Sequence, residues 1–140
     1  MKIDGVLVDS SVWIDVLRHP HDSDSARMHS MISQGLALTT GVIQAEILPF
    51  VRQGHREDTE RLFAALPMVT VQPEERFWSR VVHWRKQLVG RGLGGIALPN
   101  VMIATVALEH RTPLWSRDRH FDRIAQHCPL LRWKPEQGIG

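Results

Sequence analysis

Three carboxylates and one amide are spaced along the chain so that a single site could collect them. These residues are Asp9, Glu46, Asn100 and Asp118, separated by 37, 54 and 18 residues. Carboxylates gathered in one cleft repel each other unless a cation or a proton lies between them. Oxygen ligands without paired His or Cys favour a hard divalent ion over zinc. The residue types therefore indicate a site for Mg²⁺ or Mn²⁺.

The elements that must position these side chains alternate along the sequence. Short β-branched or apolar runs predict strands over residues 5–10, 36–40, 68–71 and 112–116, with an edge strand over 130–133. Helical patterns fall between them, over 11–18, 26–34, 42–51 with a kink at Pro49, 56–66, a long stretch around 77–88, 98–110 and 118–127. Strands that alternate with helices predict an α/β fold with a parallel sheet covered on both faces.

This alternation also places the candidate ligands. In an open parallel sheet, sites form beyond the carboxyl ends of the strands. Asp9 ends the first predicted strand, and Asp118 follows the fourth in the same manner. Glu46 borders the apolar face of the helix after the second strand, while Asn100 opens the helix over 98–110. We therefore expect all four at one edge of the sheet.

Length and composition set further bounds. A chain of 140 residues with 43% hydrophobic content suits one compact domain. We expect that domain to span 1–134, with 135–140 as a flexible tail. The sequence has no apolar run long enough for a membrane span, and its one cysteine, Cys128, agrees with a reducing compartment. The expectation is a soluble cytoplasmic protein without a membrane partner.

Four segments carry a family resemblance. The stretches VDSSVWID, AEIL, PNVMIATVALEH and WSRDRHFDRIA, in this order and spacing, resemble the motif blocks of PIN-domain ribonucleases, and among these the VapC toxins of toxin-antitoxin pairs. The resemblance extends from Val8 to about Ala125. It implies a three-layer α/β/α fold with a central, mainly parallel sheet of four to five strands.

The resemblance also implies roles for particular residues. Asp9 matches the first acid, Glu46 the second and Asp118 the acid after the last main strand. Ser11 and Ser116 match hydroxyl residues beside the first and last acids. The acids would hold one or two Mg²⁺ or Mn²⁺ ions, which activate a water for attack on an RNA phosphodiester.

The implied partners are RNA, a second copy of the chain in a homodimer, and an antitoxin. The antitoxin would place an amphipathic helix in a hydrophobic groove and cover the site, often with a basic side chain among the acids. Arg117, Arg119 and Arg123 lie close to Asp118 in sequence and are candidates for phosphate contacts.

Two positions depart from the family pattern. Asn100 stands where a third acid is expected, and His120 replaces an acid often found two residues after the last one. An amide oxygen can still bind a hard cation, but one negative charge is missing, as a natural feature or as an introduced substitution. The sequence predicts weaker Mg²⁺ binding and slower cleavage than Asn100→Asp would give.

Each candidate also has a plainer structural interpretation. Asp9, Asn100 and Asp118 could serve only as helix caps. Glu46 could belong to an isolated ion pair, and the three arginines to a solvated face. His19 and His21 lack further ligands and are interpreted as loop residues.

Two other functions compete with the nuclease. A catalytically silent PIN fold could bind RNA or a protein partner, with Asn100 as the defect. A phosphoacceptor receiver domain also uses acids at strand ends, but no Lys follows a late strand, since Lys134 lies in the tail.

Overall fold

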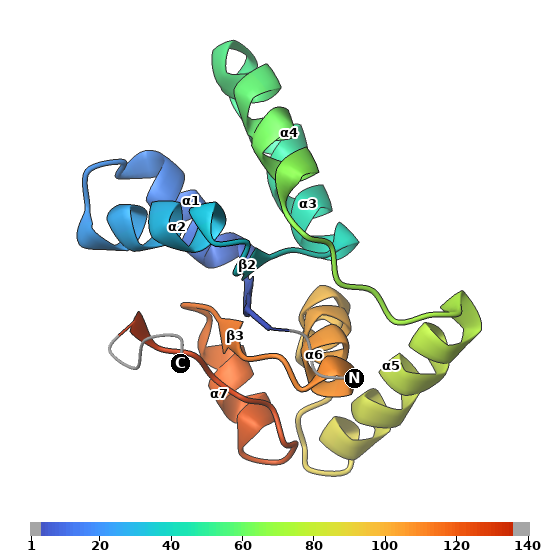
Figure 1. Cartoon of the computed structure of the whole chain (residues 1–140). Helices are drawn as coiled ribbons and strands as arrows, with labels where there is room; N and C mark the ends of the chain where they lie inside the picture. Colours follow the sequence, from blue (N-terminus) through green and yellow to red (C-terminus); the bar gives the residue numbers. More distant parts are fainter. Residues whose placement is uncertain (1–3, 136–140) are drawn as a thin grey trace.

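The computed structural model describes residues 4–135 and combines seven α-helices with a small parallel sheet (Figure 1). The strands are β1 (Val6–Val8), β2 (Ala37–Leu38) and β3 (Leu114–Trp115). The helices are α1 (Ser10–Arg18), α2 (Ser23–Ser33), α3 (Gly41–Ile47), α4 (Arg56–Ala65), α5 (Glu74–Val89), α6 (Leu98–His110) and α7 (Arg119–Ala125), with 3-10 turns η1 (Leu48–Phe50) and η2 (Gln53–His55) between α3 and α4. The α/β prediction is confirmed.

The sheet has the order β2-β1-β3 with both pairings parallel. Val6 pairs with Ala37 on one side of β1, and Val8 pairs with Trp115 on the other. All residues of the three strands are buried, which explains their continuous apolar sequence. The central position of β1 brings its carboxyl end, at Asp9, between the ends of its two neighbours.

The sheet is narrower than the four to five strands predicted. The expected strand over 68–71 forms a single parallel bridge between Thr39 and Met68, and the expected edge strand forms one between Leu114 and Arg132. Both segments therefore extend the sheet by one bridge each. An apolar run of four residues does not distinguish such a bridge from a full ladder.

The predicted helices are present, and two of them end for identifiable reasons. Pro49 lies in η1, so α3 ends at Ile47 instead of continuing through 51. The long helix ends at Gly90, within the glycine-rich stretch that follows it. Helix α6 is buried over most of its circumference, which accounts for its lack of a polar stripe.

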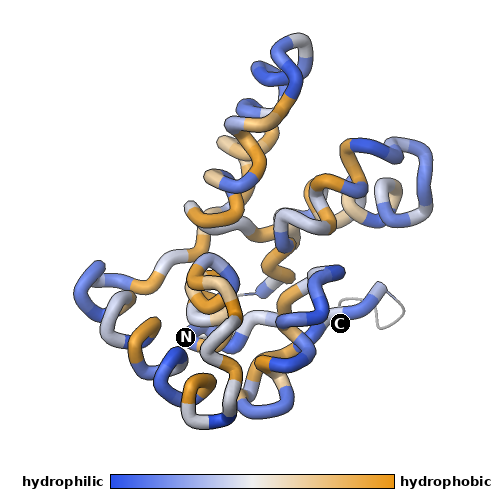
Figure 2. Tube along the Cα trace, turned by 180° about the vertical axis from the view of Figure 1, so that it is seen from behind, coloured by the Kyte–Doolittle hydropathy of each residue, from blue (hydrophilic) through white to orange (hydrophobic). Residues whose placement is uncertain are grey.

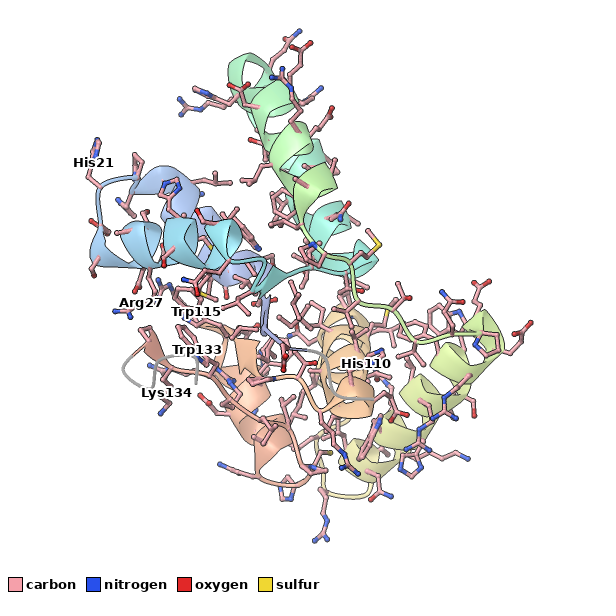
Figure 3. All side chains as sticks on the ribbon, in the orientation of Figure 1. His21, Arg27, His110, Trp115, Trp133 and Lys134 are labelled. Carbon is pink, nitrogen blue, oxygen red and sulfur yellow. The ribbon has the colours of Figure 1, made fainter. Side chains whose placement is uncertain are left out.

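Two helical pairs, α1 with α2 and α3 with α4, extend away from the sheet in different directions (Figure 1). Their inner parts carry core residues such as Trp13 and Phe63, whose ring centroids lie 4.8 Å apart. The loop between α1 and α2 is hydrophilic (Figure 2). His21 points outward from this loop (Figure 3), as the loop interpretation of the histidines predicts.

A second aromatic contact lies at the β3 edge of the sheet. Trp115 on β3 and Trp133 near the end of the described chain are both buried, with centroids 4.7 Å apart (Figure 3). The chain thus packs against β3 as far as Trp133. That one domain covers 1–134 stays a prediction, and residues 136–140 of the predicted tail lie outside the described residues.

Candidate active site

Asp9 lies at the end of β1 and is 3% exposed. It caps α1, since its side chain accepts from the backbone N–H of Ser11, and it also accepts from the Ser11 hydroxyl at 2.7 Å. The hydroxyl of Ser116, which follows β3, donates to the same oxygen, Oδ2, at 2.7 Å. Capping and site formation are therefore compatible roles for Asp9.

The two hydroxyls share one acceptor. Each has a single proton and lies 2.7 Å from Asp9 Oδ2, and the two hydroxyl oxygens are 3.2 Å apart. The hydroxyl oxygens in turn accept from the backbone: Ser11 from the N–H of Arg117 at 3.0 Å, and Ser116 from the N–H of Asp118 at 3.0 Å. The strand end at Asp9 and the loop after β3 are thereby fixed to each other.

Glu46 approaches this edge from α3 and is partly buried. Its Oε1 accepts from the Ser10 hydroxyl at 3.2 Å. Burial raises the pKa of Glu46, the negative charges of Asp9 and Asp118 raise it further, and the hydrogen bond from Ser10 opposes them. Because Ser10 follows Asp9 in sequence, its hydrogen bond brings Glu46 to the edge where β1 ends.

Asn100 is not a helix cap. The N-cap of α6 is Ala97, so that interpretation of Asn100 is wrong. The side-chain amide of Asn100 instead donates to Asp118 Oδ2 at 3.3 Å. The Asn100 amide thus donates a hydrogen bond to the Asp118 carboxylate, whereas a carboxylate at position 100 would repel it.

Asp118 caps α7 as well as facing the site. Its Oδ1 accepts from the backbone N–H of His120 at 2.9 Å and lies 2.9 Å from His120 Nδ1. Both carboxylate oxygens are thus engaged, one by His120 and the other by Asn100. The two departures from the family pattern therefore contact the same acid.

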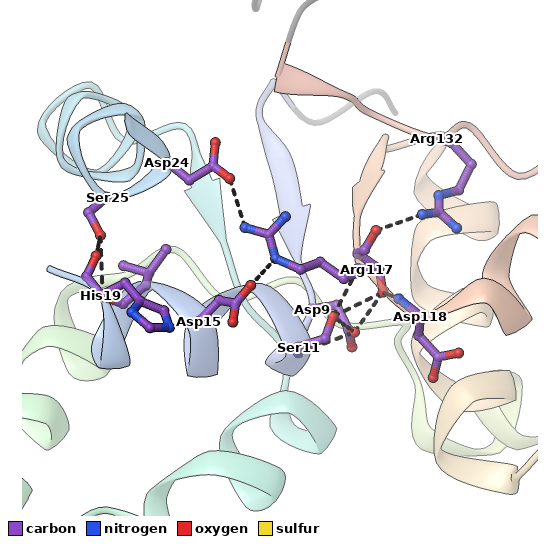
Figure 4. A network of polar contacts seen from close by, with 11 residues as sticks. Asp9, Ser11, Asp15, His19, Asp24, Ser25, Arg117, Asp118 and Arg132 are labelled. Atoms are coloured by element: carbon purple, nitrogen blue, oxygen red, sulfur yellow. Dashed lines mark hydrogen bonds and ion pairs between the residues drawn. The ribbon is translucent and has the colours of Figure 1, made fainter. Parts of the chain in front are cut away.

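The three candidate arginines differ in their surroundings. The guanidinium of Arg117 lies 2.5 Å from Asp15 on α1 and 2.7 Å from Asp24 on α2 (Figure 4). Arg119 and Arg123 are exposed on α7, and no residue in the described part of the chain forms an ion pair with them.

Sequence reasoning did not identify Arg132. Its Nη2 donates to the carbonyl oxygen of Ser116 at 2.8 Å, and its guanidinium lies 3.2 Å from Asp122 and over the ring of Phe121. Its side chain is 14% exposed. Because nothing near Arg132 in the sequence indicates its contact with Ser116, only the tertiary structure reveals it.

The oxygen donors at this edge determine which metal ion the residues could hold. Among residues 4–135, no three Asp, Glu, His or Cys side chains are placed to hold a metal by themselves. Mg²⁺, however, usually keeps several waters and binds one or two carboxylates together with phosphate oxygens. Asp9 suits that mode, since its described donors all reach Oδ2 and leave Oδ1 to other ligands. The acids fit a hydrated hard cation and not a closed zinc site.

Comparison with known proteins agrees with this architecture. The sequence profile of the PIN domain matches residues 6–126, and the chain belongs to that family. No curated protein matches the sequence. The matched range contains all four candidate site residues and ends one residue after α7.

Solved structures show the same fold at low sequence identity. DNA-bound VapBC from Salmonella typhimurium has a TM-score of 0.73 and 13% identity, covering 94% of this chain and 98% of that one. VapBC2 from Rickettsia felis, bound to a DNA fragment from its promoter, has a TM-score of 0.68 and 14% identity, with coverage of 92% and 98%. FitAcB from Neisseria gonorrhoeae has a TM-score of 0.64 and 18% identity, with coverage of 95% and 99%. The predicted resemblance to VapC-like PIN folds is confirmed.

The described residues contain no helix that is both long and apolar enough to cross a membrane.

Proposed function

We propose that this chain is a metal-dependent endoribonuclease and the toxin of a type II toxin-antitoxin pair. The observation that carries the proposal is the shared edge of Asp9, Glu46 and Asp118: Ser10, next to Asp9, donates to Glu46, and the Ser116 hydroxyl donates to Asp9 and accepts from the N–H of Asp118. Such clustered carboxylates suit phosphoryl transfer, which depends on positioning and charge neutralisation more than on a protein nucleophile.

In the proposed reaction Asp9 would be the main metal ligand, and Glu46, Asp118 and the Asn100 amide oxygen would be further ligands. When bound, Mg²⁺ or Mn²⁺ would activate a water and stabilise the leaving oxygen. The hydroxyls of Ser11 and Ser116 donate to Asp9 Oδ2, which leaves Oδ1 as the oxygen proposed for the metal. Arg119 and Arg123 are proposed to contact RNA phosphates from α7.

The test compares RNA cleavage by the wild type and by Asp9→Asn. Asparagine keeps the shape of the side chain and an oxygen that can cap α1, but it loses the charge and carries an NH2 group in place of the second oxygen. We expect Mn²⁺-dependent cleavage that excess EDTA removes and that falls at least about a hundredfold in the variant, because one metal ligand loses its charge. Asp58→Asn removes the same charge from an exposed position on α4 and serves as the control. Equal cleavage by the wild type and Asp9→Asn would refute the proposal.

A groove beside Glu46 is the proposed antitoxin site. It has a volume of about 730 Å³ and is lined by Ile14 and Leu17 of α1 and by Phe50 and Val51 across from them, with Glu46 in its wall. Phe50 is 81% exposed, which is unusual for an aromatic side chain of this size. An amphipathic helix would cover these apolar residues and bring a basic side chain to Glu46.

Co-expression tests this partner. The wild type should arrest growth when induced, and its antitoxin should relieve the arrest. Phe50→Glu should remain toxic but resist relief, because a carboxylate in the apolar groove opposes helix docking. Relief that is unchanged in Phe50→Glu would place the antitoxin elsewhere.

We also propose a homodimer, supported by an apolar stripe on α5. Trp78, Val82 and Val89 are 42%, 51% and 55% exposed on this helix. Light scattering of the wild type and of Val82→Glu tests this: the wild type should have twice the monomer mass, and the variant should dissociate.

The alternative is a catalytically silent PIN fold that binds RNA or protein. The hydrogen bond from Asn100 to Asp118 favours it, since the amide occupies one oxygen of a proposed ligand. Metal-dependent cleavage that Asp9→Asn abolishes would exclude this alternative.

A further inference from the structure

Arg117 connects three separate parts of the fold through its side chain. It follows β3 and precedes Asp118 in sequence, but its guanidinium lies between α1 and α2 (Figure 4). Nε contacts Asp15 on α1 at 2.5 Å, and Nη2 donates to Asp24 on α2 at 2.7 Å. The loop after β3 is thereby joined to both helices of one helical pair.

The backbone of the same residue reaches the acids. The N–H of Arg117 donates to the Ser11 hydroxyl, which donates to Asp9. The residues on either side of Arg117 belong to the same network: the Ser116 hydroxyl donates to Asp9 and accepts from the backbone N–H of Asp118. Fixing the backbone at residue 117 thus fixes the positions of Asp9 and Asp118 relative to each other.

We infer that Arg117 is a positioning residue whose ion pairs with Asp15 and Asp24 align the acids, and that it is not a contact for RNA phosphates. Only the expected effect on the cleavage rate rests on the proposed nuclease function; the positioning of the acids does not. Two carboxylates engage the guanidinium of Arg117, and Arg27 lies 3.9 Å from Asp24, so the positive and negative charges balance and the cluster has no net attraction for a phosphate. Arg119 and Arg123 lack such carboxylates and remain the candidates for RNA contact.

The exposure of these side chains indicates that the ion pairs matter more for alignment of the acids than for the free energy of unfolding. The side chains of Arg117, Asp15 and Asp24 are 37%, 45% and 26% exposed, so solvent screens their attraction. Their loss should change global stability little. Alignment is more sensitive, since a displacement of about 1 Å in an active site can reduce the rate about a hundredfold.

Helix α4 supplies a matched control. Arg61 lies 3.7 Å from Glu57 and 3.8 Å from Asp58, so it is also an arginine with two carboxylate partners. Both acids are in the first turn of α4, as Asp24 is in the first turn of α2. Arg61→Ala and the double variant Glu57→Gln/Asp58→Asn therefore remove the same kinds of charge from a cluster that lies within one helix and connects no separate elements.

The first measurement is amide hydrogen exchange on the metal-free protein, which requires no activity. In Arg117→Ala and in Asp15→Asn/Asp24→Asn, exchange at the amides of residues 117 and 118 should accelerate about tenfold or more. Exchange at the amides of α6 should be unchanged in these variants. In the control variants, exchange at the amides near the site should equal that of the wild type. Unaltered exchange at 117 and 118 in both variants would overturn the inference, whether or not the protein cleaves RNA.

The second measurement uses a fluorescein-labelled single-stranded RNA of mixed sequence with Mn²⁺. If Arg117 contacted phosphate, removing its acidic partners would free it, and Asp15→Asn/Asp24→Asn would bind this RNA more tightly and cleave it at least as fast. We expect instead that kcat falls about tenfold or more in this variant, and that adding Arg117→Ala to it causes no further loss. Faster cleavage by the double variant would contradict the positioning role. If the wild type cleaves no RNA, the proposed function fails, and hydrogen exchange alone decides the role of Arg117.

Discussion

Asn100 donates its side-chain amide to Asp118 Oδ2 across 3.3 Å, at the position where the sequence resemblance implies a third acid. This contact gives Asn100→Asp two opposite effects. Without metal, the variant replaces a hydrogen bond with repulsion between two carboxylates and should be less stable. With metal, it adds a negative charge that attracts the cation. Two unit charges about 4 Å apart attract each other by about 4 kcal/mol at an effective dielectric near 20. A third of that energy corresponds to about tenfold in metal affinity.

Thermal unfolding and Mn²⁺ titration test both effects in one pair of proteins. Asn100→Asp should melt below the wild type in EDTA, bind Mn²⁺ about tenfold more tightly and cleave RNA faster. Asn100→Ala should bind Mn²⁺ no better than the wild type, since it brings no charge. Equal Mn²⁺ affinity of all three would show that position 100 has no metal role.

Glu46→Gln should stabilise the metal-free protein at neutral pH. Burial, together with the charges of Asp9 and Asp118, raises the pKa of Glu46, so its ionised form is disfavoured in the folded state. A raised carboxyl pKa costs stability above the folded pKa, and the cost disappears below the ordinary value, where Glu46 is protonated in both states. Glutamine keeps an acceptor for Ser10 and carries no charge.

The melting temperatures of the wild type and Glu46→Gln should therefore differ most at pH 7 to 8 and converge near pH 4 in EDTA. Saturating Mn²⁺ should reverse the order, since the wild type gains more from the cation. The exposed Glu57→Gln is the control and should show no such pH dependence. A variant less stable than the wild type at pH 7 in EDTA would contradict the expected sign.

Ser116→Ala should lower both stability and activity. The hydroxyl of Ser116 donates to the buried Asp9 and accepts from the N–H of Asp118, so alanine leaves both groups without this partner. Loss of hydrogen bonds to a buried charged group costs about 1–3 kcal/mol. Urea unfolding should report this decrease, while Ser33→Ala, which loses only an exposed bond to the carbonyl of His29, should remain near the wild type. A decrease equal in both variants would mean that Ser116 does not support Asp9.

The sequence predicted the helices and the strand ends well because both depend on local patterns. A run of β-branched residues followed by Asp9 indicates the end of a buried strand wherever the strand pairs. The lengths of the strands were less predictable, since Met68 and Arg132 each make one bridge to a neighbouring segment. The number of paired residues depends on tertiary packing and not on the apolar run itself.

That these residues form a functional site stays a prediction, while part of their local structure follows from the sequence. Asp9 and Asp118 follow from strand ends and serve as helix caps as well, so the two interpretations did not exclude each other. The partners of Arg117 were not predictable, because Asp24 lies 93 residues away and neither residue differs in sequence from a solvated charge. Long-range contacts between polar side chains have no periodic signal.

Glu109 on α6 forms a polar joint with three side chains of α5. Its side chain is 10% exposed, accepts from Trp84 Nε1 at 3.0 Å and lies 3.0 Å from Arg80 and 3.4 Å from Arg76. Burial alone would raise the pKa of Glu109, but the hydrogen bonds from Trp84 and Arg80 and the charges of both arginines together lower it. A lowered carboxyl pKa gives stability above the unfolded pKa, which is lost as pH falls through the folded pKa.

We therefore expect Glu109→Gln to lower the free energy of unfolding by about 1–3 kcal/mol at pH 7, because charged hydrogen bonds are replaced by neutral ones. The difference from the wild type should shrink as the pH is lowered from 5 to 3, where the wild type also loses its charge. Urea unfolding at intervals across this range measures it, with Glu57→Gln as a control for an exposed glutamate. If the difference stayed constant down to pH 3, the joint would depend on packing of α5 against α6 and not on the ionised Glu109.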